Sequence, residues 1–195
     1  MQTALAPIFS DMLVRYQQTA IRQTGRRPVT YLRSPIDDDL MMPGCTRPGC
    51  AFWQPIAWPK GQPRIGKAGK GFHQSILDYL TLCQFLEIRF KLPVAAGSSQ
   101  LSFLYNRVFE TRKNTLSSPP ARALEEAQLY QREHPQWPLG YCMAATCDAG
   151  EPILLMIAAE DGQAYILRAE SDVPPLCLKL GLDRLLPKLQ FVYEI

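Results

Sequence analysis

Apolar residues recur at helical spacing in three segments of the chain. In residues 5–24 one stripe consists of Leu5, Phe9, Met12, Leu13, Tyr16 and Ala20. Gly25 follows, at the position where a helix usually ends. We interpret this segment as a core-facing helix, because a membrane-surface helix would carry more Lys and Arg on its polar face. Phe72 to Leu86 predicts a second helix, with His73 as a capping or solvated side chain at its start, and residues 121–133 predict a third after two serines and two prolines.

Alternation of apolar and polar residues predicts strands elsewhere. The first well-specified strand is Ala51-Phe52-Trp53-Gln54-Pro55, in which Phe52 and Trp53 face opposite sides and the proline ends the pairing. Residues 88–92 and 100–106 predict a hairpin.

The last third of the chain predicts three more strands, over 140–146, 152–159 and 163–168. Asp161-Gly162 predicts that the second and third of these pair antiparallel. The second is nearly all apolar, which is typical of a strand covered on both faces. Residues 174–189 are predicted to form a short helix interrupted near Gly181. Together these elements predict an α+β fold with a central, mostly antiparallel sheet flanked by helices, in a single domain over residues 1–195.

Residues 26–49 are predicted to be irregular, because four prolines interrupt them. The segment contains Asp37, Asp38 and Asp39, three adjacent carboxylates that are either simply solvated or a docking patch for a cationic partner. A metal site there is less favoured, because no calcium-loop spacing follows.

A basic, glycine-rich stretch lies between Leu40 and Leu77, where five basic residues and no acidic residue occur. Residues 61–68 nearly match a phosphate-binding loop. However, Ala68 lacks the hydroxyl that would bind magnesium, and Pro63 lacks one amide. We therefore favour a flexible basic loop over a nucleotide site, and predict no cofactor.

Composition narrows the chemistry further. The net charge of +3 is too small to indicate a nucleic-acid partner. The six cysteines are expected to be reduced core thiols, with Cys142 and Cys147 on opposite faces of a strand. The sequence leaves open whether Cys45 and Cys50 ever form a disulfide. Two isolated cysteine pairs and only two histidines predict no zinc site.

No set of nucleophile, base and orienting group is visible, so we predict that the chain is not an enzyme. An enzyme would need carboxylates that the fold brings together, such as Asp148 and Glu160. The amino-terminal residues lack the features of a signal peptide, and no apolar run could cross a bilayer. We therefore expect a cytoplasmic protein whose contact with the inner membrane, if any, is made through a protein partner.

The order of elements and several local residues resemble the Syd family of SecY-interacting proteins, within the SUKH superfamily. The resemblance covers most of the chain, from the helix ending near Tyr16 to the hairpin at Gly162, and is most specific at Trp53-Gln54-Pro55. It implies the α+β fold described above, no catalytic centre, and a protein-binding role.

Two partners follow from this resemblance. Family relatives bind either the cytosolic face of SecY, through an acidic groove, or the toxin domains used in bacterial competition. The positive net charge and the basic loop weigh against the SecY partner, so we favour an immunity protein that neutralises a toxin domain. The acidic residues predicted to bind a partner through their charge are Asp37, Asp38, Asp39, Glu160 and Asp161. Trp53 is a candidate anchor, although a strand tryptophan more often lies in the core.

Overall fold

A computed structural model describes residues 4–31, 41–46, 48–54, 65–82, 88–92, 101–105, 119–148, 151–169 and 173–193. Asp37, Asp38 and Asp39, as well as Pro55, Lys60 and Arg64, lie outside these described residues. In the described part the helices are α1 (Leu5–Thr24), α2 (Gln74–Thr81), α3 (Pro119–Glu133) and α4 (Leu182–Leu185), with short 3-10 turns η2 (Gly66–Gly69) and η3 (Leu186–Lys188). The α+β fold class predicted from the sequence is confirmed.

Within the described residues, seven strands form an antiparallel sheet in the order β10-β4-β5-β6-β7-β8-β9. Their bounds are β4 (Ile88–Leu92), β5 (Leu101–Tyr105), β6 (Gly140–Asp148), β7 (Glu151–Ala158), β8 (Gln163–Arg168), β9 (Leu176–Gly181) and β10 (Gln190–Phe191). The predicted β4–β5 and β7–β8 pairs are both present and antiparallel.

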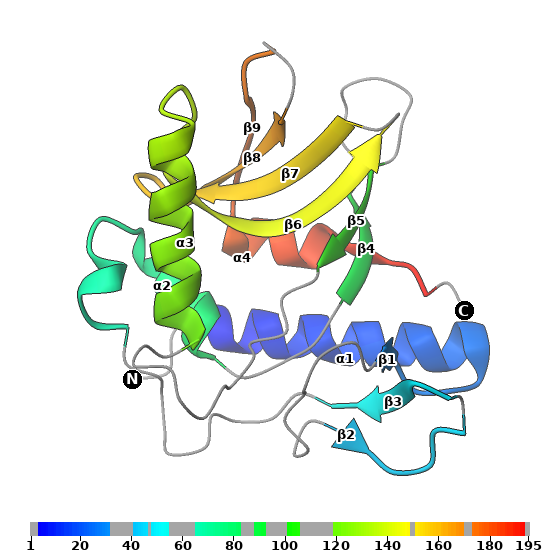
Figure 1. Ribbon diagram of the computed structural model, residues 1–195. Coiled ribbons are helices and arrows are strands. Elements are labelled where there is room, and N and C mark those ends of the chain that lie inside the picture. Colours follow the sequence, from blue (N-terminus) through cyan, green and yellow to red (C-terminus); the bar gives the residue numbers. More distant parts are fainter. Residues whose placement is uncertain are drawn as a thin grey trace.

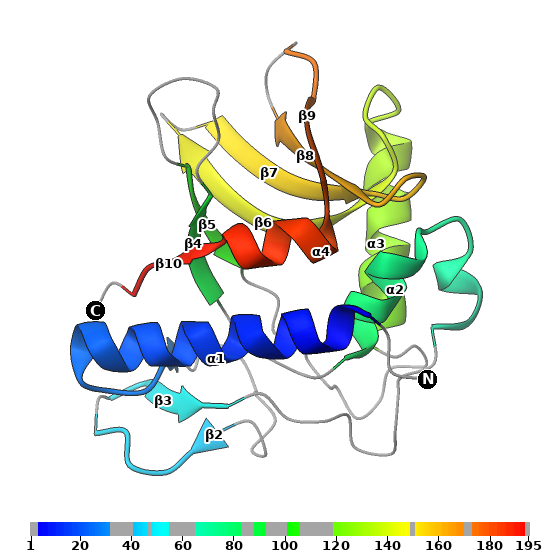
Figure 2. The ribbon, with the colours of Figure 1, turned by 180° about the vertical axis from the view of Figure 1, so that it is seen from behind.

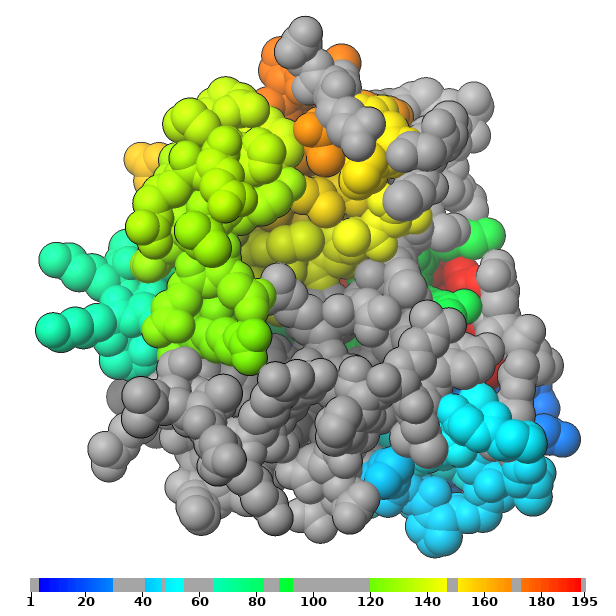
Figure 3. All heavy atoms as spheres, in the orientation of Figure 1, coloured from blue at the N-terminus to red at the C-terminus, as the bar shows by residue number. Residues whose placement is uncertain are grey.

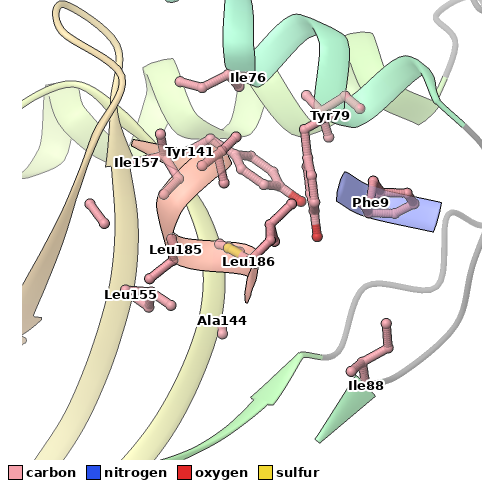
Figure 4. Close-up of a cluster of buried hydrophobic side chains, with 14 of the residues drawn as sticks. Phe9, Ile76, Tyr79, Ile88, Tyr141, Ala144, Leu155, Ile157, Leu185 and Leu186 are labelled. Carbon is pink, nitrogen blue, oxygen red and sulfur yellow. The ribbon is translucent and has the colours of Figure 1, made fainter. Parts of the chain in front are cut away.

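The main core lies on one face of this sheet. There α1, α2 and α4 cover the strands (Figures 1 and 2), and the whole predicted stripe of α1 is buried. Figure 4 shows Phe9 of α1, Tyr79 of α2 and Leu186 close to Tyr141 and Ile157 of the sheet. The predicted end of α1 is also confirmed, because Gly25 is left-handed and its amide donates to the Ile21 carbonyl.

A second, smaller sheet lies on the far side of α1, in the order β1-β3-β2 (Figure 1). It consists of β1 (Val29–Tyr31), β2 (Met41–Met42) and β3 (Cys50–Trp53). The predicted strand at Phe52 and Trp53 is therefore present, but it pairs outside the large sheet. The prediction of an irregular segment over residues 26–49 is wrong at β1 and β2, where two short strands fit between the prolines and pair with β3.

The carboxyl-terminal prediction is wrong in its first half. Residues 176–181 form edge strand β9, paired with β8, and the helix begins only at Leu182. Leu176, Leu178 and Leu180 alternate with other residues, which is the period of a strand. The leucines that follow belong to α4 and η3, and their helical spacing hides this strand signal.

A β-bulge in β6 corrects the prediction for two cysteines. The register with β7 shifts between Cys142 and Ala144, so that Met143 and Ala144 are both buried in the main core. Cys142 pairs with Met156, and position 147 pairs with Pro152. Met156 and Pro152 are an even number of residues apart on β7, so they face the same side. Positions 142 and 147 therefore share one face of the sheet, because the extra residue reverses the alternation.

Trp53 belongs to the main core. Its side chain is 1% exposed and its ring centroid lies 6.0 Å from that of Tyr16. The hypothesis that Trp53 anchors a partner is therefore not supported, since a side chain this buried offers no surface. Its indole N–H is buried and, among the described residues, is one of two buried side-chain polar atoms without a hydrogen-bond partner.

Trp53→Ala is expected to lower the free energy of unfolding by about 3–5 kcal/mol, because it removes a large buried side chain and leaves a cavity. Chemical denaturation followed by circular dichroism measures this loss. Leu129→Ala is the matched control, since Leu129 is 50% exposed on α3 and its truncation should change stability by less than about 0.5 kcal/mol. A stable, fully folded Trp53→Ala protein would contradict the core assignment.

Candidate functional site

A groove lies between α3 and the outer face of the large sheet, the face opposite the main core. It encloses a volume of about 260 Å³. Its walls consist of Ala123, Glu126, Ala127 and Tyr130 from α3, Gly140, Tyr141 and Cys142 from β6, and Leu154 and Met156 from β7. Figure 3 shows the hollow between α3 and the surface of these strands.

The groove exists because α3 covers the outer face only in part. The inner face belongs to the extended main core, whereas the buried residues of the outer cluster are Trp137, Met156 and Leu167. The amino-terminal half of α3 packs into the main core through Ala123 and Leu124. Its carboxyl-terminal half reaches the outer cluster through Tyr130. The helix thus crosses from one cluster to the other, and the apolar surface beside it is left half-covered.

Stacked rings close off the carboxyl-terminal end of α3. The rings of Tyr130, His134 and Trp137 contact one another in a triangle: the His134 centroid lies 4.6 Å from that of Tyr130 and 4.4 Å from that of Trp137, and the other two lie 5.4 Å apart. His134 and Trp137 are nearly parallel, at 16°. The Trp137 amide donates to the His134 carbonyl, which holds the turn after the helix. Such contacts between aromatic rings are favourable beyond the area that they bury. Of these rings, Tyr130 lines the groove, and the contacts with the other two hold it in place.

The walls of the groove are mainly apolar, and Tyr130 and Glu126 are among its polar side chains. Burial raises the pKa of the Tyr130 phenol, and the neighbouring Cys142 and Glu133 raise it further. This phenol therefore stays neutral at physiological pH and can donate a hydrogen bond. The Glu126 carboxylate accepts from Arg122 at 3.3 Å on the exposed side of the helix. The arrangement suits an apolar group with one polar atom.

Gly140 fixes how closely β6 and β7 approach at the base of the groove. A Cβ atom there would lie 2.7 Å from the Ile157 carbonyl oxygen. Glycine is required because a backbone oxygen of a central strand cannot move aside. The sequence pattern marked Gly140 only as the start of a strand.

Glu160 and Asp161 lie where the sequence predicted a turn, between β7 and β8, and both are exposed. Asp161 accepts a hydrogen bond from the Gln163 amide at 2.9 Å. The turn lies next to α2, because the ring of His73 packs against Gly162. His73 caps α2, because its ring accepts a hydrogen bond from the Ser75 amide. Of the two roles predicted for His73, capping is therefore the one observed. These acidic residues are therefore separate from the groove walls.

Gly162 is the tightest point of this turn. Its φ of +68° is left-handed, and a Cβ atom would lie 2.4 Å from Nδ1 of His73. Gly162→Ala is expected to cost about 1–2 kcal/mol of stability from backbone strain alone, and more from the contact with the ring.

A double-mutant cycle with His73→Ala separates the two effects, with thermal unfolding as the measurement. The contact part should vanish in the double variant and the strain should remain. If Gly162→Ala is neutral in both backgrounds, the described turn is wrong.

Asp161 also acts on Tyr165 of β8. The hydrogen bond between this phenol and the Cys177 thiol raises the pKa of Tyr165 to about 12, with burial and the charge of Asp161 adding to the effect. Cys177 in turn donates to the side-chain carbonyl of Gln163 at 3.5 Å. The folded chain holds this proton more tightly than the unfolded chain does. The contribution of Tyr165 to stability is therefore fully present below the ordinary tyrosine pKa near 10. It is lost as the pH rises toward about 12.

Asp161→Asn is expected to lower the pKa of Tyr165, because it removes a nearby negative charge. Phenolate absorbance across alkaline pH measures the change, and Tyr165→Phe identifies which transition belongs to this residue. Glu160→Gln is the matched control, since it removes the adjacent charge without a direct effect on Tyr165. An equal shift in both variants would show that the effect is not local.

The carboxylate pair considered for an enzyme does not form. Asp148 is the last residue of β6 and pairs with Glu151 at the start of β7, whereas Glu160 follows the other end of β7. Eight residues of strand place these ends roughly 24 Å apart. Paired carboxylates in glycoside hydrolysis lie within about 10 Å of each other. In the described part of the chain, no three His, Cys, Asp or Glu side chains are grouped so that they could hold a metal ion.

The groove has no signal in the sequence. Its residues are ordinary apolar positions of a helix and two strands, and Cys142, Leu154 and Met156 lie on the outward side of a strand pair. The apolar character of both faces of β7 was visible, and it predicted coverage on both sides. Only the position of α3 shows that the coverage is incomplete.

No protein-family model matches the chain, and no curated protein matches it. The resemblance to the Syd family therefore stays a hypothesis based on the residues quoted for it. None of the described helices is both long enough and apolar enough to span a bilayer.

Proposed function

We propose that this chain is a non-catalytic protein-binding module that binds and neutralises a bacterial toxin domain, with the α3 groove as part of its docking surface. The observation that carries the proposal is the half-covered apolar face of the sheet between α3 and β7. A concave apolar surface with an aromatic ring in its wall is the kind of place where an apolar side chain of a partner gains most from burial.

The character of the groove bears on the choice of partner. A docking site for the Lys/Arg-rich cytosolic loops of SecY should be lined by carboxylates. The groove is instead mainly apolar, and its one lining carboxylate, Glu126, is paired with Arg122. This favours a toxin domain as the partner. The positive net charge of the sequence favours the same choice.

SecY is the second candidate, and a different surface supports it. Glu160, Asp161 and Asp183 are all exposed. Because Gly181 pairs with Gln163, the start of α4 lies beside the β7–β8 turn, and this brings Asp183 toward Glu160 and Asp161. Such an acidic corner would attract basic loops. On this alternative the protein would reach the cytosolic face of the inner membrane through its partner.

The first experiment is capture of partners from the native host, using gently solubilised membranes and mass spectrometry of what co-elutes. Recovery of a toxin domain supports the main proposal, and recovery of SecY supports the second. Recovery of neither by a folded protein would contradict both.

Leu154→Glu is expected to weaken capture of the toxin domain at least tenfold, because it places a charge on the floor of the groove. Leu129→Glu, the same change on the exposed side of α3, is the matched control and should bind normally. Ala127→Leu fills the groove without adding charge, and it guards against a folding defect in Leu154→Glu. Affinity is measured with the purified partner. Unchanged binding by both groove variants, with normal circular dichroism, would exclude the groove as the docking surface.

A further inference from the structure

The face of the molecule that carries α1 and α4 concentrates positive charge. Residues 4–31 and 182–189 contain six basic side chains and two acidic ones: Arg15, Arg22, Arg26, Arg27, Arg184 and Lys188, against Asp11 and Asp183. The rest of the described chain contains eight basic and eight acidic residues, so it has no net charge. These two segments alone therefore carry four more positive than negative side chains.

The two segments form one surface. Figure 2 shows α1 and α4 side by side along this face, with no described element in front of α1. The Arg15 guanidinium joins them, because it donates to the backbone carbonyls of Leu186, Pro187 and Leu189 at 2.9–3.4 Å. These bonds hold the carboxyl-terminal end of η3 against α1, and a cation at that end of a helix is favourable. The segment that follows α4 is thus held against α1.

Apolar side chains accompany the charge. Val14 and Ile21 are 46% and 49% exposed, and they are two of the five large apolar residues exposed in the described part of the chain. They lie seven residues apart, so they share one side of a helix about 30 Å long. Arg22, next to Ile21, is exposed, as are Arg26 and Arg27 just beyond the end of α1. A surface on which exposed apolar side chains lie beside basic ones is suited to contact an anionic membrane.

We propose that the α1–α4 face, defined by Val14, Ile21, Arg22, Arg26, Arg184 and Lys188, docks directly on an anionic lipid bilayer. Charge complementarity identifies the occupant: lipid phosphates attract each Lys or Arg near the surface, and the two exposed apolar side chains enter the headgroup region. Taken alone, α1 carries too few basic residues for this role. The tertiary structure supplies the others from α4 and from the segment after Gly25.

This inference is independent of the proposed toxin binding, because the α3 groove opens on the face shown in Figure 3, whereas α1 lies in front in Figure 2. Each surface can therefore be altered without the other. A protein docked through α1 would still present the groove to a partner.

The test is co-sedimentation of the full-length protein with vesicles of phosphatidylcholine containing about 30% phosphatidylglycerol, compared with vesicles of phosphatidylcholine alone. Binding is expected only to the anionic vesicles, and it should fall at least tenfold between about 50 mM and about 500 mM salt. The double variant Arg22→Glu/Arg26→Glu should lower the bound fraction at least tenfold at low salt. Val14→Ser/Ile21→Ser should lower the bound fraction several-fold, and the binding that remains should be more sensitive to salt.

Lys67→Glu/Lys70→Glu is the matched control, because it makes the same change in charge at exposed positions near η2, toward the other end of α1 (Figure 1). It should bind as the wild type does. Equal binding to both kinds of vesicle, or an equal loss in this control, would overturn the proposal. A further outcome would also overturn it: binding to a single-stranded RNA homopolymer that is tighter than binding to the anionic vesicles and that Arg22→Glu/Arg26→Glu abolishes. The face would then be a nucleic-acid-binding surface. Normal capture of the protein partner by Arg22→Glu/Arg26→Glu would separate the two functions.

Discussion

The antiparallel pairing of β6 with β7, together with its bulge, is the constraint on which the rest of the structure depends. The bulge turns both Met143 and Ala144 toward the main core, and it keeps Cys142 on the outer face. Gly140 allows the two strands to approach closely where the pairing begins. Since side chains on a strand alternate, this one extra residue decides which positions are packed under α1, α2 and α4 and which line the groove beside α3. A regular β6 would present a different set of side chains to each face.

The two faces of the sheet therefore differ in how completely they are covered. The inner face lies under three helices and forms the main core, which accounts for most of the buried apolar side chains. Among the described residues, the outer face is covered by the carboxyl-terminal half of α3 and the ring of Trp137, and a groove remains beside them. Charge is distributed unevenly over the surface. The carboxylates of α3 lie on the side of the groove, whereas those of the β7–β8 turn border the α4 end of the basic α1–α4 face. A molecule with an apolar groove and a separate basic face can contact two different surfaces at once, which is the feature that joins the proposed protein partner to the proposed membrane surface.

Prediction from the sequence succeeded where one local signal was strong. The stripe of α1 was predicted residue for residue, because a long helix repeats its pattern over five turns and Gly25 marks its end. The β7–β8 hairpin followed from Asp161-Gly162. Prediction failed where two signals overlapped or where the partner was distant. At Leu176 to Gly181 a strand pattern runs directly into a helical one. At β1 and β2 the strands are too short to show a pattern and exist only because β3 pairs with them. For Cys142 and Cys147 simple alternation was assumed, and a bulge leaves no clear mark in the sequence.

The sequence by itself determined the class of the fold, the strands and helices with long or sharply bounded patterns, and the segments that hold charge. These are local properties, set by the periodicity of side chains and by the backbone preferences of glycine and proline. Only the tertiary structure decided that Trp53 is buried, that Asp148 and Glu160 lie at opposite ends of a strand, that α3 leaves a groove, and that Arg184 and Lys188 join the arginines of α1. Each of these depends on which distant segments pack together, and the energy of that packing is spread over many weak contacts that no single stretch of sequence displays.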